Sequence, residues 1–381
     1  MADEVSKIAS QFNFAGECLD ARPYGAGHIH DTTVVRFRNA NGSVQRYILQ
    51  RLNTTVFQQP ERLMDNIERI TVHLSTKIRA DGGDPMRETL GLVPARDGKA
   101  FVKTGAGEYW RAFHFIERAQ TYDTAVSLGH TTEVAKAYGR FLRRLSDLPT
   151  EQLHETIPDF HHTEKRCKAL MEAAKRDTKH RARSATSEIG FVEKRAEQTS
   201  ILVDLLEQGG LPTRVVHNDT KLGNVMIDDR AGRSLCVIDL DTVMPGLSLY
   251  DFGDLVRSAS NPAAEDERGL SKVGVDLAVF ERCVEGYLEG VGGLLTPSEL
   301  DLFPFSAKLI ALELGMRFLT DHLQGDVYFK IHREGQNLDR CRVQFKLVEE
   351  METKHDRMAR IVETRKLARP FGSGHVSPTA C

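Results

Sequence analysis

The side chains most able to do chemistry lie in one short segment between two apolar runs. Asp219 follows the apolar pair Val215-Val216, and Asn224 comes five positions after it, directly before Val225-Met226-Ile227. A second acid, Asp239, ends another apolar run further along the chain. A carboxylate can take the proton of a hydroxyl group, and amide and carboxylate oxygens are ligands that Mg²⁺ prefers. Two acids and an amide at this spacing are typical of phosphoryl transfer.

Four nearby side chains could assist this chemistry or shape the loop that carries it. Lys221 could balance charge on a transferring phosphoryl group, or it could be an ordinary surface lysine, and its position fits both. Asp241 could be a second metal ligand or a structural acid at the strand end, and we favour the ligand. Asp251 begins an Asp-Phe-Gly metal motif, but its distance from the first acid predicts that it braces the loop or caps the following helix. His217 is expected to be structural.

The composition argues against several classes of function. With 51 basic and 54 acidic residues, the 381-residue chain has a formal net charge of −3, which does not favour a nucleic-acid or membrane partner. No run of about 18 apolar residues is present, and the N-terminus shows no secretory signal. Six cysteines without a Cys-x-x-Cys pair indicate reduced thiols. We therefore expect a cytoplasmic protein that binds small molecules, as a monomer or weak homodimer.

Residues 1–118 are predicted to form a small lobe in which strands surround one helix. Runs of β-branched and aromatic residues predict strands at 32–37, 46–50 and 108–116. Asn-Gly and Asp-Gly pairs predict hairpin turns at 41–42 and 97–98. Apolar residues at helical spacing predict one long helix through Leu63, Ile67, Ile70, Leu74 and Ile78.

Residues 119–370 are predicted to form a larger, mainly helical lobe that holds both acids. Apolar periodicity and a Thr-Pro-Ser-Glu capping box predict helices at 134–145, 201–206, 296–318 and 337–366. Residues 371–381 are expected to be a disordered tail. The predicted fold class is therefore α+β, with a small β-rich lobe and a larger helical one.

Several segments carry a resemblance to a known enzyme family. The stretches around the acids, 217–224, 238–246 and 250–254, resemble the aminoglycoside phosphotransferase superfamily. A narrower resemblance to the N-acetylhexosamine 1-kinases is carried by 24–29, 47–50, 115–117, 315–319 and 325–329. The resemblance implies a bilobal protein-kinase-like fold and transfer from ATP to the anomeric hydroxyl of N-acetylglucosamine or N-acetylgalactosamine. It also implies Asp219 as the base and Mg²⁺ held by Asn224 and Asp239.

The same resemblance implies that residues 1–118 bind the nucleotide. The glycine loop would consist of Gly25 and Gly27, although a tight hairpin can also carry such a pair. The strand lysine of protein kinases is missing, so Gln50 or Arg51 would contact phosphates, with Glu68 as a possible partner. The hinge expected to read adenine through its backbone, which could equally be an ordinary core strand, consists of Phe115, Ile116 and Glu117.

Arg317 is a charged residue within an apolar helical stretch, where an arginine needs a partner. It could form an ion pair with Glu313 or Asp321, each one turn away. Alternatively, it could donate hydrogen bonds to the acceptor. The resemblance supports the second use and implies a substrate pocket that contains Asp219, Arg317, Tyr328 and His28.

Two histidine features need an interpretation. Relatives tend to have asparagine at the place of His30, a departure that bears on sugar preference or on contacts of the ATP loop. His161 and His162 look like a metal pair, but adjacent helical residues face different ways, so we predict a surface pair.

Two other functions fit these residues. A kinase of choline, homoserine, methylthioribose or an aminoglycoside would keep the same loop, although a polycationic aminoglycoside would need more carboxylates in the pocket. A non-catalytic nucleotide-binding module is the third possibility. The intact set of Asp219, Asn224 and Asp239 counts against it.

Overall fold

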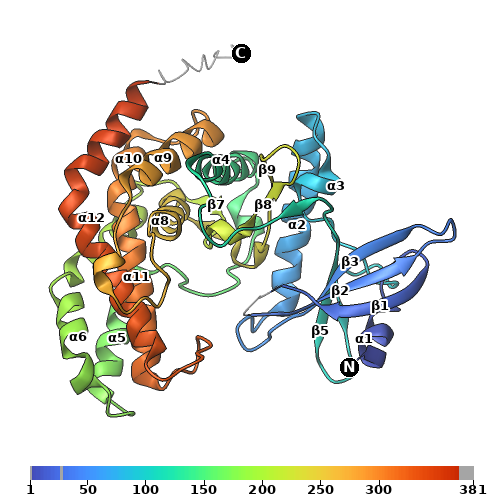
Figure 1. The fold of residues 1–381 in the computed structure, drawn as a ribbon, viewed down its shortest axis with the longest axis horizontal. Coiled ribbons are helices and arrows are strands. Elements are labelled where there is room, and N and C mark those ends of the chain that lie inside the picture. Colours follow the sequence, from blue (N-terminus) through green and yellow to red (C-terminus); the bar gives the residue numbers. More distant parts are fainter. Residues whose placement is uncertain (1, 26–28, 369–381) are drawn as a thin grey trace.

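A β-sheet region and a mainly helical region make up the computed structural model, which describes residues 2–25 and 29–368 (Figure 1). The sheet forms from the N-terminal part of the chain, and the helices follow it. This arrangement confirms the predicted α+β class. Gly27, His28 and the tail predicted at 371–381 lie outside the described residues. The predicted lobe boundary at residue 118 stays a prediction.

The N-terminal region is built on a five-stranded antiparallel sheet of order β1-β2-β3-β5-β4. Its strands are β1 Glu17–Pro23, β2 Asp31–Arg38, β3 Val44–Arg51, β4 Val102–Lys103 and β5 Tyr109–His114. One face of the sheet packs its alternating apolar residues against the helix α1, Ala2–Ala9. Both predicted hairpin turns are present, with Gly42 at φ +82° and Gly98 at φ +86°, values that glycine adopts without strain.

Helix α2, Pro60–Ala80, joins the two regions, and the short helix α3, Pro85–Glu88, follows it. All five predicted apolar positions of α2 are buried, and they belong to the same core as the C-terminal helices. The buried side chain of Asn66 donates hydrogen bonds to the backbone carbonyls of His154 and Val243, at 2.8 and 3.3 Å. The helix is therefore fixed to the C-terminal region on one side and to the sheet on the other.

The C-terminal region combines helices with two small sheets, of order β6-β8-β9 and β10-β7. Its strands are β6 Ala119–Gln120, β7 Arg214–Val216, β8 Val225–Asp228, β9 Ser234–Val237 and β10 Met244–Gly246. Its first helices are α4 Leu128–Arg144, α5 Thr163–Arg176, α6 Thr186–Glu193, α7 Ile201–Glu207 and α8 Ser248–Ala259. The later helices are α9 Leu277–Val291, α10 Pro297–Asp301, α11 Phe303–Gln324 and α12 Gln336–Leu367. None of the helices in the described ranges is long and apolar enough to cross a membrane.

Helices α4 and α9 approach each other closely because glycines lie at their contact. A Cβ on Gly286 would meet the carbonyl oxygen of Thr132, and a Cβ on Gly139 would lie 2.5 Å from the carbonyl oxygen of Tyr287. The contact positions Tyr138 of α4, whose hydroxyl donates to the Lys221 carbonyl at 2.7 Å. The helix pair thus supports the loop on which the predicted chemistry depends.

We predict that Gly286→Ala lowers the free energy of unfolding by about 1–3 kcal/mol or more, because a backbone oxygen occupies the space of the new methyl group. Gly190→Ala in α6 is the matched control, since nothing lies within 4 Å of its Cβ position. It should be neutral or stabilise by up to about 1 kcal/mol. Chemical unfolding of both variants measures the difference, and equal stabilities would contradict the close helix contact.

Candidate active site

The loop between β7 and β8, residues 217–224 and here named the catalytic loop, is held by a buried acid of α8. The Asp251 carboxylate accepts the backbone N–H groups of His217 and Asn218 at 2.9 and 2.7 Å. The Thr220 hydroxyl donates to the Asp251 carbonyl at 2.5 Å. His217 is buried, with Nε2 2.9 Å from the Ile238 carbonyl. Asp251 therefore braces the loop, and His217 has a structural place in it.

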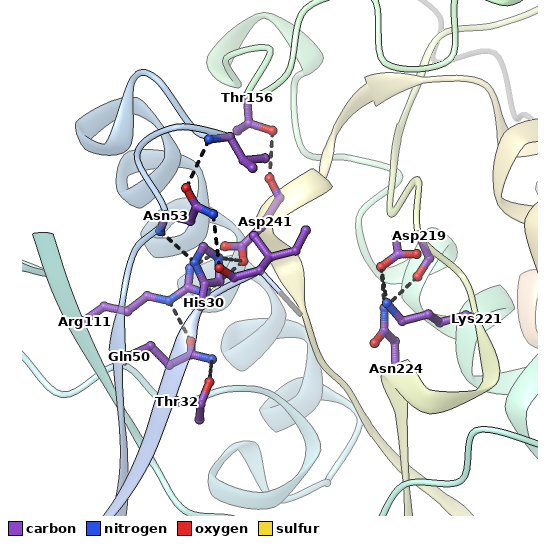
Figure 2. Close-up of polar contacts among 12 residues, drawn as sticks. His30, Thr32, Gln50, Asn53, Arg111, Thr156, Asp219, Lys221, Asn224 and Asp241 are labelled. Atoms are coloured by element: carbon purple, nitrogen blue, oxygen red, sulfur yellow. Dashed lines mark hydrogen bonds and ion pairs between the residues drawn. The ribbon is translucent and has the colours of Figure 1, made fainter. Parts of the chain in front are cut away.

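Asp219 lies half-buried in the catalytic loop with two donors on one carboxylate oxygen (Figure 2). Its Oδ2 accepts from Lys221 Nζ and from Asn224 Nδ2, each at 2.9 Å. Burial opposes ionisation, but the charge of Lys221 and the Asn224 hydrogen bond hold the pKa of Asp219 below its ordinary value. The group is therefore an ionised carboxylate that can accept a proton.

Asp239 follows β9 in the left-handed conformation, at φ +62°. Its side chain and that of Asp219 line one cleft between the two regions of the chain. In the part of the chain that the structure describes, no hydrogen bond or ion pair to this carboxylate is found. Although the Asp239 side chain is exposed in the cleft, desolvation and repulsion from Asp241 and Asp219 outweigh the charges of Lys221 and Arg111 and raise the pKa of Asp239 to about 6. An acid close to two other acids, with no hydrogen-bond or ion-pair partner of its own among the described residues, is a place that favours a cation.

The residues present fit Mg²⁺. The amide nitrogen of Asn224 points to Asp219, which leaves its side-chain oxygen to act as a ligand beside Asp239. No group of three His, Cys, Asp or Glu side chains that could hold a metal exists among the described residues. A metal here would therefore need further oxygens, and Mg²⁺ usually takes them from substrate phosphates and water.

Asp241 is engaged by a buried polar cluster (Figure 2). Arg111 of β5 forms a two-point ion pair with its carboxylate, and His30 Nε2 lies 2.8 Å from Oδ2. Arg111 and His30 outweigh the effect of burial and hold the pKa of Asp241 well below its ordinary value. Both oxygens are therefore occupied, and our preference for Asp241 as a metal ligand is corrected. It is the structural acid, and it joins the catalytic region to the sheet.

Arg111 is the residue that the sequence analysis missed. It is 3% exposed, and its Nε donates to Gln50 Oε1 at 2.9 Å, while Gln50 Nε2 donates to Thr32 at 2.9 Å. In the sheet register, Arg111 lies opposite Gln50. The sequence feature that could have identified Arg111 is a charged side chain within the mainly apolar run Tyr109–His114, because a buried charge needs a partner.

Two predicted phosphate-site residues lie elsewhere. Glu68 is exposed, and Ile67 is the α2 residue that lines the cleft, because successive helical residues point about 100° apart. Glu68 is therefore not the partner of Gln50. Arg51 forms surface ion pairs with Asp31 and Glu108. The buried cation of the N-terminal region is Arg111 instead.

The predicted hinge lines the cleft through Phe115 and Ile116. Phe115 donates its N–H to the Arg46 carbonyl at 3.2 Å, and Glu117 forms a surface ion pair with Arg46. Within residues 2–25 and 29–368, no partner is found for the N–H and carbonyl groups of Ile116, although the residue is buried. Such groups usually have partners, so this segment can read a ligand through its backbone.

One cleft of about 1330 Å³ brings most of these residues together. Its walls include Gly25, Gln50, Arg111, Asp219, Lys221 and Asp239. Arg317 and Tyr328 are not among the described residues that line it.

Arg317 lies against aromatic rings rather than in an ion pair. Its guanidinium carbon is 4.9 Å from the ring centre of Phe160, 5.6 Å from that of Phe329 and 5.9 Å from that of Tyr328. Asp321, one expected partner, accepts the backbone N–H groups of 327–329. No carboxylate partner of Arg317 is found among the described residues.

His161 corrects the prediction of a surface histidine pair. It is 8% exposed, with Nδ1 3.1 Å from both Glu313 carboxylate oxygens and Nε2 3.0 Å from the Asn218 carbonyl. Glu313, the other expected partner of Arg317, is thus held by His161. Only His162 is near the surface, where its side chain caps α5.

Comparison with known proteins identifies the family and the fold of this chain. A sequence model of the phosphotransferase enzyme family matches residues 21–284. Among solved structures, a microcompartment-associated aminopropanol kinase is 16% identical with a TM-score of 0.60, covering 94% of this chain and 98% of that chain. An aminoglycoside phosphotransferase from Alicyclobacillus acidocaldarius is 14% identical with a TM-score of 0.60, covering 94% and 96%.

A third structure, an amicoumacin kinase in complex with AMP-PNP, Ca²⁺ and Ami, is 13% identical with a TM-score of 0.56, covering 90% of this chain and 92% of that chain. At these identities the likeness shows the fold. It confirms the predicted bilobal protein-kinase-like architecture.

We predict that Asp239→Asn raises the melting temperature of the metal-free protein by about 1 °C at pH 7.5, a small effect because Asp239 is exposed in the cleft and solvent screens its charge. A carboxyl whose pKa is raised from 3.8 to about 6 on folding favours the folded state while it is protonated. That contribution is present below pH 3.8 and is lost as the pH rises through about 6, where the variant gains its advantage.

Asp251→Asn is the control, because burial also raises the pKa of Asp251 to about 6. This acid accepts two buried backbone N–H groups, so its loss should lower stability by about 1–3 kcal/mol. Thermal unfolding of both variants between pH 5 and pH 8 measures these two changes in stability. A stabilised Asp251→Asn with a destabilised Asp239→Asn would reverse the two roles.

Proposed function

This chain belongs to the phosphotransferase enzyme family, and from that premise we propose that it is an ATP-dependent kinase of N-acetylhexosamines. The reaction would transfer the γ-phosphoryl group of ATP to the anomeric hydroxyl of N-acetylglucosamine or N-acetylgalactosamine, giving the sugar 1-phosphate. The observation that carries the phosphotransferase part is the pair of acids in one cleft. One is paired with Lys221 and Asn224, and the other has no partner among the described residues.

In this proposal, Asp219 accepts the proton of the attacking hydroxyl. Its depressed pKa keeps it ionised at neutral pH, and the anomeric hydroxyl is acidic for an alcohol, so a weak base is sufficient. Lys221 holds the carboxylate in place and presents its cation to the cleft. As the hydroxyl proton reaches Asp219, the lysine balances charge at the reacting centre.

The nucleotide would lie along the N-terminal side of the cleft. Ile116 offers its backbone groups to adenine, and Gly25 begins the phosphate loop. The strand lysine is missing, and the positive charge on this side comes from Arg111, which is paired with Asp241 and Gln50. Asn224 and Asp239 would hold Mg²⁺, which neutralises triphosphate charge when bound. Free thiols at the five described cysteines support a cytoplasmic location.

The acceptor assignment rests on Arg317 and Tyr328. A half-buried guanidinium that has no hydrogen-bond partner among the described residues, beside three aromatic rings, suits the hydroxyl groups and the apolar face of a sugar ring. The Phe160 ring precedes His161, which contacts the catalytic loop at Asn218. The two carboxylates one turn away from Arg317, Glu313 and Asp321, are engaged by His161 and Asn337 and leave the guanidinium to the acceptor.

The proposal is tested by incubating the protein with Mg²⁺ and ATP and a panel of N-acetylhexosamines, amino alcohols and aminoglycosides. Phosphorus NMR locates the new ester. We expect a sugar 1-phosphate from an N-acetylhexosamine. A phosphorylated amino alcohol or aminoglycoside, with no sugar product, would refute the sugar assignment, and no transfer or hydrolysis would favour a binding module.

Asp219→Asn keeps the size of the side chain and removes the proton acceptor. We expect kcat to fall about 10²- to 10⁴-fold while ATP binding, measured by calorimetry, changes little. Turnover close to that of the wild type would remove Asp219 from the role of base.

Arg317→Leu should raise the KM for N-acetylhexosamine about 10- to 100-fold, because donors to the sugar are lost, while the KM for ATP stays within a few-fold. Arg195→Leu is the control, since Arg195 lies over the Phe191 ring and pairs with Glu352. Steady-state kinetics that match for the two variants would show that Arg317 serves stability only.

A further inference from the structure

His161 is a buried titratable group that the proposed mechanism does not use. Its Nε2 lies 3.0 Å from the Asn218 carbonyl, and its Nδ1 lies 3.1 Å from both oxygens of Glu313. A carbonyl oxygen and an ionised carboxylate can only accept hydrogen bonds. Both contacts are satisfied together only when each ring nitrogen carries a proton.

The contact with Asn218 acts on the peptide group that leads into Asp219. The Asn218 carbonyl and the Asp219 N–H belong to one planar peptide unit. His161 faces the carbonyl side of this unit, and His217 Nδ1 lies 3.3 Å from the Asp219 nitrogen on the other side. Asn218 itself has a left-handed φ of +65°, so its conformation depends on the contacts around it.

The contact with Glu313 acts on α11. Glu313 and Arg317 are one helical turn apart, a spacing at which opposite charges normally pair. Here His161 takes both oxygens of Glu313, and Arg317 lies on Phe160, Tyr328 and Phe329. Without the imidazole, the carboxylate would be left free to pair with Arg317.

We propose that His161 is a positioning residue whose imidazolium fixes the peptide unit before Asp219 and holds Glu313 away from Arg317. It thereby couples the acceptor pocket on α11 to the catalytic loop. The coupling rests on the proposed acceptor pocket. The protonation state of His161 rests only on its contacts.

The charged and titratable groups around the ring agree with this state. Burial opposes protonation, but Glu313 and the Asn218 carbonyl raise the pKa of His161 above its ordinary value, with Arg317 acting against them. Asp251 interacts with His161 from α8, and the Tyr250 ring centre lies 5.0 Å from that of His161. The contribution to stability is therefore fully present below the ordinary pKa of histidine and is lost as the pH rises through the raised pKa.

The first experiment is ¹⁵N NMR of histidine-labelled protein at pH 7.5. The His161 signal is assigned as the one that disappears in His161→Gln, and in the wild type it should be that of an imidazolium. In Glu313→Gln, the His161 signal should be that of a neutral ring. A neutral His161 in the wild type would overturn the proposal. This measurement needs no substrate, so its outcome is separate from that of the acceptor panel.

The second experiment compares the kinetics of His161→Gln with those of the wild type. We expect kcat to fall about 10- to 100-fold because the base is displaced. The KM for the acceptor should rise about tenfold or more, with the KM for ATP unchanged. The alkaline limb that His161 gives to the wild-type kcat profile should be absent from the variant.

His154→Gln is the matched control, because His154 also faces a carboxylate, Asp65, at 3.0 Å but is 37% exposed. It should keep wild-type kinetics. If His161→Gln melts at a lower temperature but the folded protein keeps normal kcat, KM and pH profile, the residue is only structural and the proposal fails.

Discussion

Two carboxylates, Asp219 and Asp239, line one cleft and a third, Asp241, is buried nearby in the sequence, and the way each charge is compensated sets the rest of the site. Asp219 has a lysine and an amide, and Asp241 has a guanidinium and an imidazole. Asp239 has no partner within the described residues, and desolvation and its neighbours raise its pKa to about 6. Ionising this acid beside two other acids is opposed by their charges, although its exposure to solvent weakens the effect. A bound cation would remove that repulsion, which fits the proposed use of Asp239.

The compensating groups also hold the two regions of the fold together. Arg111 comes from the sheet, and Asp241 follows β9, so their buried ion pair joins the sheet to the C-terminal region. His30 supports the same acid in a defined tautomer, since its Nδ1 accepts the Asn53 N–H and Nε2 must therefore donate. A buried ion pair is weak evidence for stability by itself. Here it ties β5 of the sheet to the segment after β9 that also carries Asp239.

The sequence predicted the elements well where one physical signal dominates. The apolar period of 63–78 predicted α2, and the capping box at Thr296 formed with both of its hydrogen bonds. It also predicted that Asp219, Lys221, Asn224 and Asp239 lie together, because two short strands end beside each other. The roles of these residues stay predictions.

The sequence could not predict partners that lie far apart in the chain. Arg111 and Asp241 are 130 positions apart, and His161 and Glu313 are 152 apart, so no local pattern joins them. The expectation that Glu68 is a partner at the phosphate site fails for a different reason, since Glu68 is exposed on α2. Helical periodicity identifies an apolar face but does not say which of its edges meets a cleft.

If a cation that arrives with the nucleotide compensates Asp239, nucleotide binding must depend on Mg²⁺ through this side chain. Calorimetric titration of AMP-PNP into wild type and Asp239→Asn at pH 7.5, with and without Mg²⁺, measures that dependence. We expect Mg²⁺ to strengthen binding to the wild type about tenfold or more, and the variant to lose this dependence. An equal effect of Mg²⁺ on both proteins would show that Asp239 does not hold the cation.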